Sequence, residues 1–128
     1  MATPLPKKLL LKPGTQARFI NTPAGFWETF GTLPGKVALQ SGGKETCDWT
    51  LLFAKSEHEL KKFAENAIES LKLGSIFWVA FPKKTSGEQT TLSMREGWTI
   101  LEEAGYEPVA SASIDATWSA QRFRPTVQ

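Results

Sequence analysis

The sequence predicts an α/β domain in which a mainly parallel sheet of about six strands carries helices on both faces. Two observations predict it. An amphipathic helix stands between two continuous apolar runs, which is the layout of a β–α–β unit, and a second, shorter unit of this kind lies upstream. A chain of 128 residues has room for one such core and not for two. We expect an N-terminal extension over residues 1–16 and the domain over residues 17–125.

The strongest helical signal spans Ser56–Leu73. Ser56 and Glu59 have the spacing of a capping box, in which the serine hydroxyl accepts from the third amide and the glutamate returns to the cap amide. Gly74 follows where helices commonly end. One face repeats apolar residues with helical spacing: Leu60, Phe63, Ala64, Ala67, Ile68 and Leu71. This helix is expected to lie on a sheet.

The runs on either side of this helix, Thr50–Ala54 and Ser75–Phe81, predict strands. Both are apolar without alternation, as expected of strands that are covered on both faces. A right-handed crossover between them places the two strands in parallel.

The upstream unit begins with a predicted strand at Ala17–Ile20. Thr22 and Pro23 then have the residue types that start a helix, and Gly31 could end it. Lys36–Leu39 is expected to be the next strand.

The C-terminal third predicts a helix and then a hairpin. Ser93 and Glu96 suggest a second capping box, and Gly105 ends the helix. Val109–Asp115 and Trp118–Arg124 predict two antiparallel strands at the sheet edge. The helix would turn Met94, Trp98 and Leu101 inward. The expected strand order is 2-1-3-4-6-5, with the last strand antiparallel.

Composition and charge exclude several classes of protein. A net charge of +2 gives no electrostatic argument for nucleic acid or an anionic membrane. The longest apolar run, Ile76–Pro82, is less than half of a ~20-residue membrane span. Leu9–Leu11 is shorter than the ~7–15 apolar residues of a signal peptide. The single cysteine, Cys47, excludes an internal disulfide and fits a reducing compartment. The expected location is the cytoplasm.

Several segments carry a resemblance to known proteins. Asp48–Leu52 and Leu71–Phe77 look like the approaches to the fourth and fifth strands of a shortened class I methyltransferase, a Rossmann-like fold, and the closing hairpin looks like its last two strands. Over roughly 12–125 the chain also resembles a family of short bacterial proteins known only as a domain of unknown function. That resemblance rests on Lys12–Gly14, Asn21–Phe26, Trp78–Gly87 and Thr117–Phe123. It implies a Rossmann-like sheet and no particular activity.

The first loop departs from the methyltransferase pattern. A cofactor loop is glycine-rich, and an acidic residue follows the second strand to hold the ribose. Here Asn21–Phe26 contains one glycine and a proline without an amide hydrogen, and Gln40–Gly43 contains no carboxylate. We therefore expect no cofactor, and neither S-adenosylmethionine nor NAD in particular.

The segment Pro82–Gly87 is the strongest candidate for a binding site. It follows a buried strand at the end where open α/β sheets bind ligands. Its polar residues could hold a phosphate or carboxylate, with Asn21 and Thr22 across the crevice. The alternative is a solvated polar loop. The candidate residues within the segment are Lys83, Lys84, Thr85 and Ser86.

Trp118 and Arg122 are a second candidate pair for ligand contacts. They could supply an aromatic face and a guanidinium group, or the tryptophan could pack against the last helix while the arginine extends outward. His58 is the only histidine, so it has no partner for a zinc cluster, and Cys47 has no adjacent base. No metal site is expected.

The sequence contains no complete catalytic apparatus. The leading hypothesis is a non-catalytic binding or regulatory module for a small anion, a nucleotide or a partner protein. The alternative is a small enzyme whose site uses Lys83, Ser86, Asp115 and Arg122. The fold class does not choose between them, and the sequence leaves the oligomeric state open.

Overall fold

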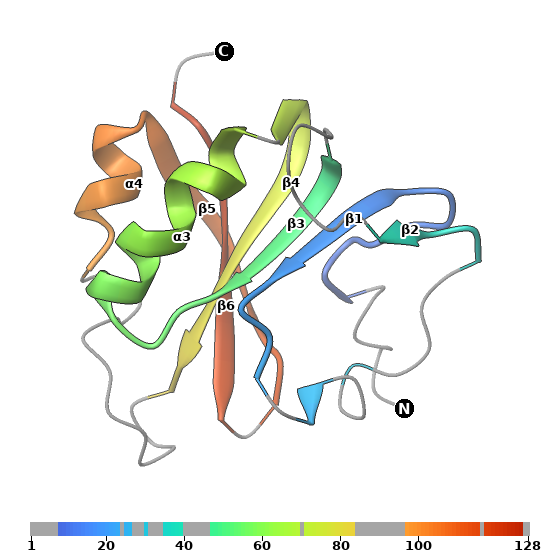
Figure 1. Cartoon of the computed structure of the whole chain (residues 1–128), viewed down its shortest axis with the longest axis horizontal. Helices are drawn as coiled ribbons and strands as arrows, with labels where there is room; N and C mark the ends of the chain where they lie inside the picture. The colour runs from blue at the N-terminus through green and yellow to red at the C-terminus, as the bar shows by residue number, and fades with distance from the viewer. Residues whose placement is uncertain are drawn as a thin grey trace.

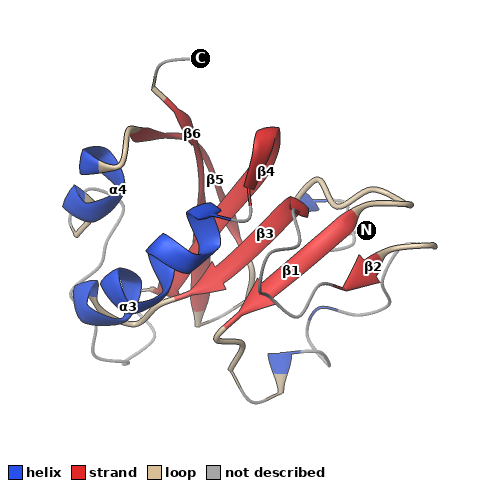
Figure 2. Cartoon of the chain, turned by 45° about the horizontal axis from the view of Figure 1, so that its top comes forward, coloured by secondary structure: helices blue, strands red, loops and turns tan. Residues whose placement is uncertain are grey.

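One mixed β-sheet organises the molecule, and its strands lie in the order β2-β1-β3-β4-β6-β5. The first four strands in that order are mutually parallel, and β6 is antiparallel to both β4 and β5. The expected α/β class with a mixed sheet is confirmed (Figures 1 and 2). The computed structural model describes residues 8–23, 25–26, 30, 35–39, 47–69, 71–83, 97–115 and 117–126.

Five of the strands have five residues or more, whereas β2 has two residues. The bounds are β1 (Gln16–Ile20), β2 (Ala38–Leu39), β3 (Cys47–Phe53), β4 (Leu71–Pro82), β5 (Tyr106–Ser113) and β6 (Trp118–Pro125). The strand expected at 36–39 is thus reduced to its last residues. The predicted hairpin is present as β5 and β6.

Helix α3 (Glu57–Glu69) begins where the sequence predicts. The Glu59 amide donates to Ser56 Oγ at 3.2 Å. The Glu59 carboxylate does not return to the cap amide as expected but accepts from the Lys55 amide at 2.8 Å. The predicted end at Leu73 was wrong, because Leu71 already belongs to β4 and pairs with Cys47.

Helix α4 (Thr99–Glu103) is one short turn that follows the buried Trp98. It ends at Gly105 as predicted. That residue has a φ of +88°, which glycine adopts without steric cost, and its amide donates to Glu102 O. Residues 93–96, the expected capping box, lie outside the described residues.

Within the described residues, α3 and α4 cover the same face of the sheet (Figure 1). Their buried side chains pack on the sheet residues Leu52, Phe77, Val79 and Phe123. We expected helices on both faces. In the described part of the chain, the other face is covered by the N-terminal segment and by two phenylalanines, and the residues concerned are Leu9, Leu11, Phe26 and Phe30.

The segment expected as an N-terminal extension contributes to this second face. The Leu9 side chain is fully buried. Its carbonyl oxygen accepts hydrogen bonds from the indole nitrogens of Trp49 (2.7 Å) and Trp78 (2.8 Å). Buried N–H donors need a hydrogen-bond acceptor. The N-terminal segment supplies one acceptor for both indole N–H groups.

Candidate functional site

The carboxyl ends of β1 and β3 are bridged by one side chain. Asn21, the residue after β1, donates from Nδ2 to the Phe53 carbonyl oxygen at 2.9 Å and, at a longer 3.4 Å, to Glu59 Oε1. Its φ of +58° lies in the left-handed region, which asparagine tolerates better than most residues. The crevice that a Rossmann-like fold opens between these strands is therefore crossed by Asn21.

The loop that follows β1 turns toward the core of the protein and does not line an open site. Gly25 has a φ of +79°, and the Phe26 amide donates to Pro23 O at 3.2 Å. The Phe26 ring is 4% exposed and contacts the Phe53 ring edge-on, with centroids 4.8 Å apart. Thr22 is exposed. The loop thus supplies a core side chain at the place where a cofactor loop would present glycine amides.

At the other half of this edge, two lysines converge on one serine. Lys83, the residue after β4, donates from Nζ to Ser113 Oγ at 2.6 Å, and its amide donates to Thr117 O. Lys8 donates from Nζ to Ser113 O at 2.7 Å. We name Lys8, Lys83 and Ser113 the lysine corner. The predicted site residues Lys84, Thr85 and Ser86 lie outside the described residues.

The residues expected on the two sides of one crevice are not neighbours. Asn21 follows β1 and Lys83 follows β4, and β3 lies between these strands. Adjacent strands are ~4.8 Å apart, so the two strand ends are separated by about 10 Å. Asn21 bonds to β3, on the side that faces β4, whereas Lys83 bonds to β5, on the far side of β4.

Trp118 and Arg122 are not part of the lysine corner. Trp118 is 7% exposed, and its ring meets Phe53 edge-on at 5.1 Å. It packs on the face away from α4, so the expected contact with the last helix was wrong. Arg122 pairs with Trp78, four positions down the sheet from Pro82, and its Nε is buried without a hydrogen-bond partner.

Asp115, named for the enzymatic alternative, closes the turn between β5 and β6. Its Oδ1 accepts from the amides of Thr117 and Trp118, both at 2.8 Å. The carboxylate thus serves the backbone of its own turn. Asp115 lies two residues after Ser113 in the chain, and Ser86 is outside the described residues. Of the four residues in that alternative, the described geometry sets Arg122 away from this turn, because it pairs with Trp78.

Two absences hold for the described residues. Within them, no group of three or more His, Cys, Asp or Glu side chains could hold a metal ion. His58 is exposed in the first turn of α3. In the same part of the chain, no helix is long and apolar enough to cross a membrane.

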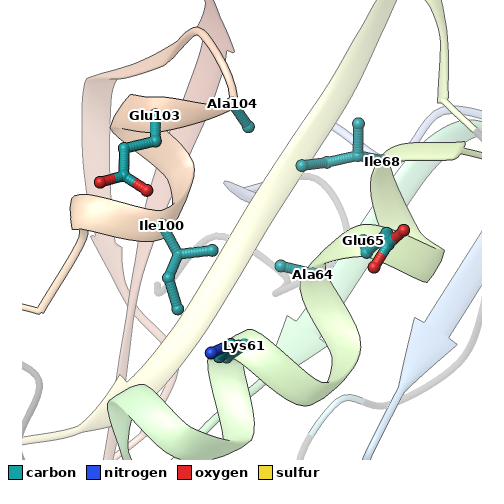
Figure 3. A pocket seen from close by; sticks show the side chains of 7 residues that line it. All are labelled: Lys61, Ala64, Glu65, Ile68, Ile100, Glu103 and Ala104. Atoms are coloured by element: carbon teal, nitrogen blue, oxygen red, sulfur yellow. The ribbon is translucent and has the colours of Figure 1, made fainter.

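A groove between α3 and α4 was missed by the sequence analysis. It encloses about 370 Å³, and Figure 3 shows Ile68 and Ala104 pointing toward each other from the two helices. Its lining residues are Lys61, Ala64, Glu65, Ile68, Ile100, Glu103 and Ala104. Half-buried Ile68 was assigned to the sheet-facing stripe of its helix from its spacing, and spacing alone does not show how far apart two helices stand.

Comparison with known proteins identifies the fold. No protein-family model and no curated protein matches the chain. The DhpI–SAH complex superposes with a TM-score of 0.65 at 9% identity, over 98% of this chain and 83% of DhpI.

Two named methyltransferases superpose less closely. The ribosomal protein L11 methylase from Lactobacillus delbrueckii subsp. bulgaricus gives a TM-score of 0.58 at 10% identity, over 93% of this chain and 73% of the other. The N-methyltransferase NodS from Bradyrhizobium japonicum WM9 gives 0.55 at 13% identity, over 87% and 86%. The chain has a shortened class I methyltransferase-like fold, as the sequence resemblance implied. Sequence identities this low show similarity of fold and nothing about function.

Proposed function

We propose that this protein is a non-catalytic binding module on a methyltransferase-like scaffold, and that its ligand is a small anion held at the lysine corner. The observation that carries the proposal is the convergence of two ammonium groups on Ser113. Lys8 Nζ lies 2.7 Å from its carbonyl oxygen, and Lys83 Nζ lies 2.6 Å from its hydroxyl oxygen.

Two ammonium groups that bond to the same residue repel each other, and an anion between them would relieve the repulsion. The Ser113 hydroxyl can rotate and donate to the same anion. The corner also stands at the carboxyl end of the sheet, where open α/β folds bind ligands. Lys84, Thr85 and Ser86 directly follow Lys83 and would extend the site with one more charge and two hydroxyls.

The carboxyl ends of β1 and β3, which we call the closed half of the carboxyl edge, argue against binding of a nucleoside cofactor. DhpI is seen with SAH and with SAM. In this chain the carboxyl ends of β1 and β3 are bridged by the Asn21 side chain, and the buried Phe26 ring packs on Phe53. Binding a nucleoside there would require breaking the bond to Phe53 O and moving a buried ring. We therefore expect no measurable binding of S-adenosylmethionine, SAH or NAD by calorimetry.

The proposal is tested with inorganic phosphate and pyrophosphate as probes, by thermal shift and calorimetry. The wild type should be stabilised by both anions in proportion to their binding. Lys83→Ala should remove most of that shift, and Lys8→Ala should reduce it. The matched control is Lys12→Ala, which removes an exposed lysine elsewhere in the described chain and should leave the shift unchanged. Equal shifts in all four proteins would reject the lysine corner.

A further inference from the structure

Among the described residues, the two edges of the sheet differ in length and in composition. One edge is β2, a strand of two residues. The other is β5, a strand of eight residues with the sequence YEPVASAS. A long edge strand presents unpaired N–H and C=O groups, and proteins usually protect such strands with charges, prolines, bulges or covering segments. The two-residue β2 exposes few such groups and needs little protection. The eight-residue β5 exposes more of them and needs protection along its length.

The first half of β5 has this protection. Pro108 lacks an N–H group, the register shifts between Pro108 and Ala110, and Glu107 carries a charge that meets Arg124 at 3.4 Å. The second half, from Ala110 to Ser113, contains only alanine and serine, and three of its four residues are exposed. The described protection there is Lys8, which donates to Ser113 O.

The hydrogen bonds of the hairpin show which groups face outward. The Ile114 amide donates to Trp118 O at 3.0 Å, so Ile114 faces β6. Strand residues alternate between the inner and the outer side of an antiparallel pair. Ser113 and Ser111 therefore turn their backbone groups away from β6, toward the open edge, and Ala112 between them turns inward.

This stretch is symmetric about Ala112. An antiparallel copy of the same strand would set Ser111 opposite Ser113 and Ala112 opposite Ala112. Each Ser111–Ser113 pair would exchange two N–H···O=C bonds. Both serine hydroxyls point to one face and could bond across the strands, and the alanines on the other face are too small to clash. The Ser113 carbonyl has two lone pairs, so it can accept from Lys8 and from a partner amide.

We propose that the β5 edge is a self-association surface, on which a second copy of this chain adds its own β5 in antiparallel fashion through Ser111 and Ser113. The result is a symmetric dimer with a sheet that continues across the two-fold axis. The occupant is a second copy because the exposed Ser-Ala-Ser pattern matches itself. The inference rests on the backbone of β5 and not on the anion, although Ser113 and Lys8 belong to the lysine corner as well.

The test is sedimentation equilibrium over a wide concentration range, combined with hydrogen exchange. The wild type should form a dimer, and the amides of Ser111 and Ser113 should gain protection as the dimer fills. Ser111→Pro removes an outward N–H that makes no bond within the sheet, and it should weaken association at least about tenfold because two symmetric hydrogen bonds are lost. Ser111→Lys places a charge at the edge and should act in the same direction. The matched control, Ser111→Thr, keeps the hydroxyl and the amide and should still dimerise.

Circular dichroism checks that each variant is folded, and Ser111→Lys preserves the test if the proline variant is not. A wild type that stays monomeric at every concentration overturns the proposal. A dimer that forms without protection of the Ser111 and Ser113 amides overturns it as well, because a different surface would then hold the two copies.

Discussion

At the end of β1 a neutral amide side chain crosses to the next strand, whereas at the end of β4 a charged ammonium group crosses toward β5. Asn21 bonds to a backbone carbonyl, Phe53 O, and to a carboxylate that also caps the N-terminal side of α3. Lys83 bonds to the hydroxyl of an exposed serine. The first contact joins groups that are part-buried, and the second lies at the surface.

Under the proposed function, this difference separates a structural half of the carboxyl edge from a binding half. Breaking the Asn21 bridge leaves a part-buried carbonyl without its partner, which costs stability. Moving Lys83 from Ser113 to an anion exchanges one exposed polar contact for a charged one, and exposed lysines contribute little to folding. In our proposal, the carboxyl edge binds its ligand at the ends of β4 and β5, while Asn21 bridges the ends of β1 and β3.

The largest effect is expected from Phe53→Ala, because Phe53 lies beneath both halves. Its ring contacts Phe26 at 4.8 Å and Trp118 at 5.1 Å, and it is fully buried. The free energy of unfolding in urea should fall by about 3–5 kcal/mol. Phe63→Ala is the control, since Phe63 is only half-buried in α3 and should cost distinctly less. Similar losses in the two variants would mean that Phe53 does not link the halves.

Asn21 should show the next largest effect. Asn21→Ala loses the bond to Phe53 O and puts alanine at a φ of +58°, so we expect a loss of about 1–3 kcal/mol in urea denaturation. Asn21→Gly loses the same bond without the backbone strain and should be the more stable of the two. If glycine restores full stability, the bridge itself contributes nothing and the closed half is held by Phe26 alone.

Glu59 should matter less than Asn21. Glu59→Gln keeps an oxygen that can accept from the Lys55 amide but removes the negative charge from the first turn of α3. The loss is expected to be about 0.3–1 kcal/mol and to shrink at high salt, because the charge interacts with the helix dipole. Thermal unfolding at low and high salt measures it, and a loss that does not depend on salt would assign the effect to the hydrogen bonds instead.

Local features of the sequence were predictable because their causes are local. Ser56 and Glu59 begin α3, and Gly105 ends α4, through contacts within a few residues. The end of α3 was not predictable from the helix itself. Leu71 becomes part of β4 because Cys47, far upstream, pairs with it, and such tertiary pairing overrides helical spacing.

Only part of the lysine corner could be predicted from the sequence. The sequence placed Lys83 correctly directly after a buried strand, and its role in binding stays a prediction. Its partner Ser113 depends on how β6 inserts between β4 and β5, which no local pattern reports. Arg122 lies close to Trp118 in sequence, but four strand residues span ~13 Å, which removes it from the edge.

The smallest effect on stability is expected from Lys83→Ala. Its contrast with Asn21→Ala tests whether the two halves of the carboxyl edge have different roles. Lys83 is half-buried and its bond to Ser113 is exposed, so the free energy of unfolding should change by less than about 0.5 kcal/mol. Over the same protein samples, the thermal shift given by inorganic phosphate should be largely lost. Asn21→Ala should behave in the opposite way, with a clear loss of stability and an unchanged phosphate shift. A Lys83→Ala variant that is strongly destabilised, or an Asn21→Ala variant that no longer responds to phosphate, would mean that the two halves of the edge are not separable.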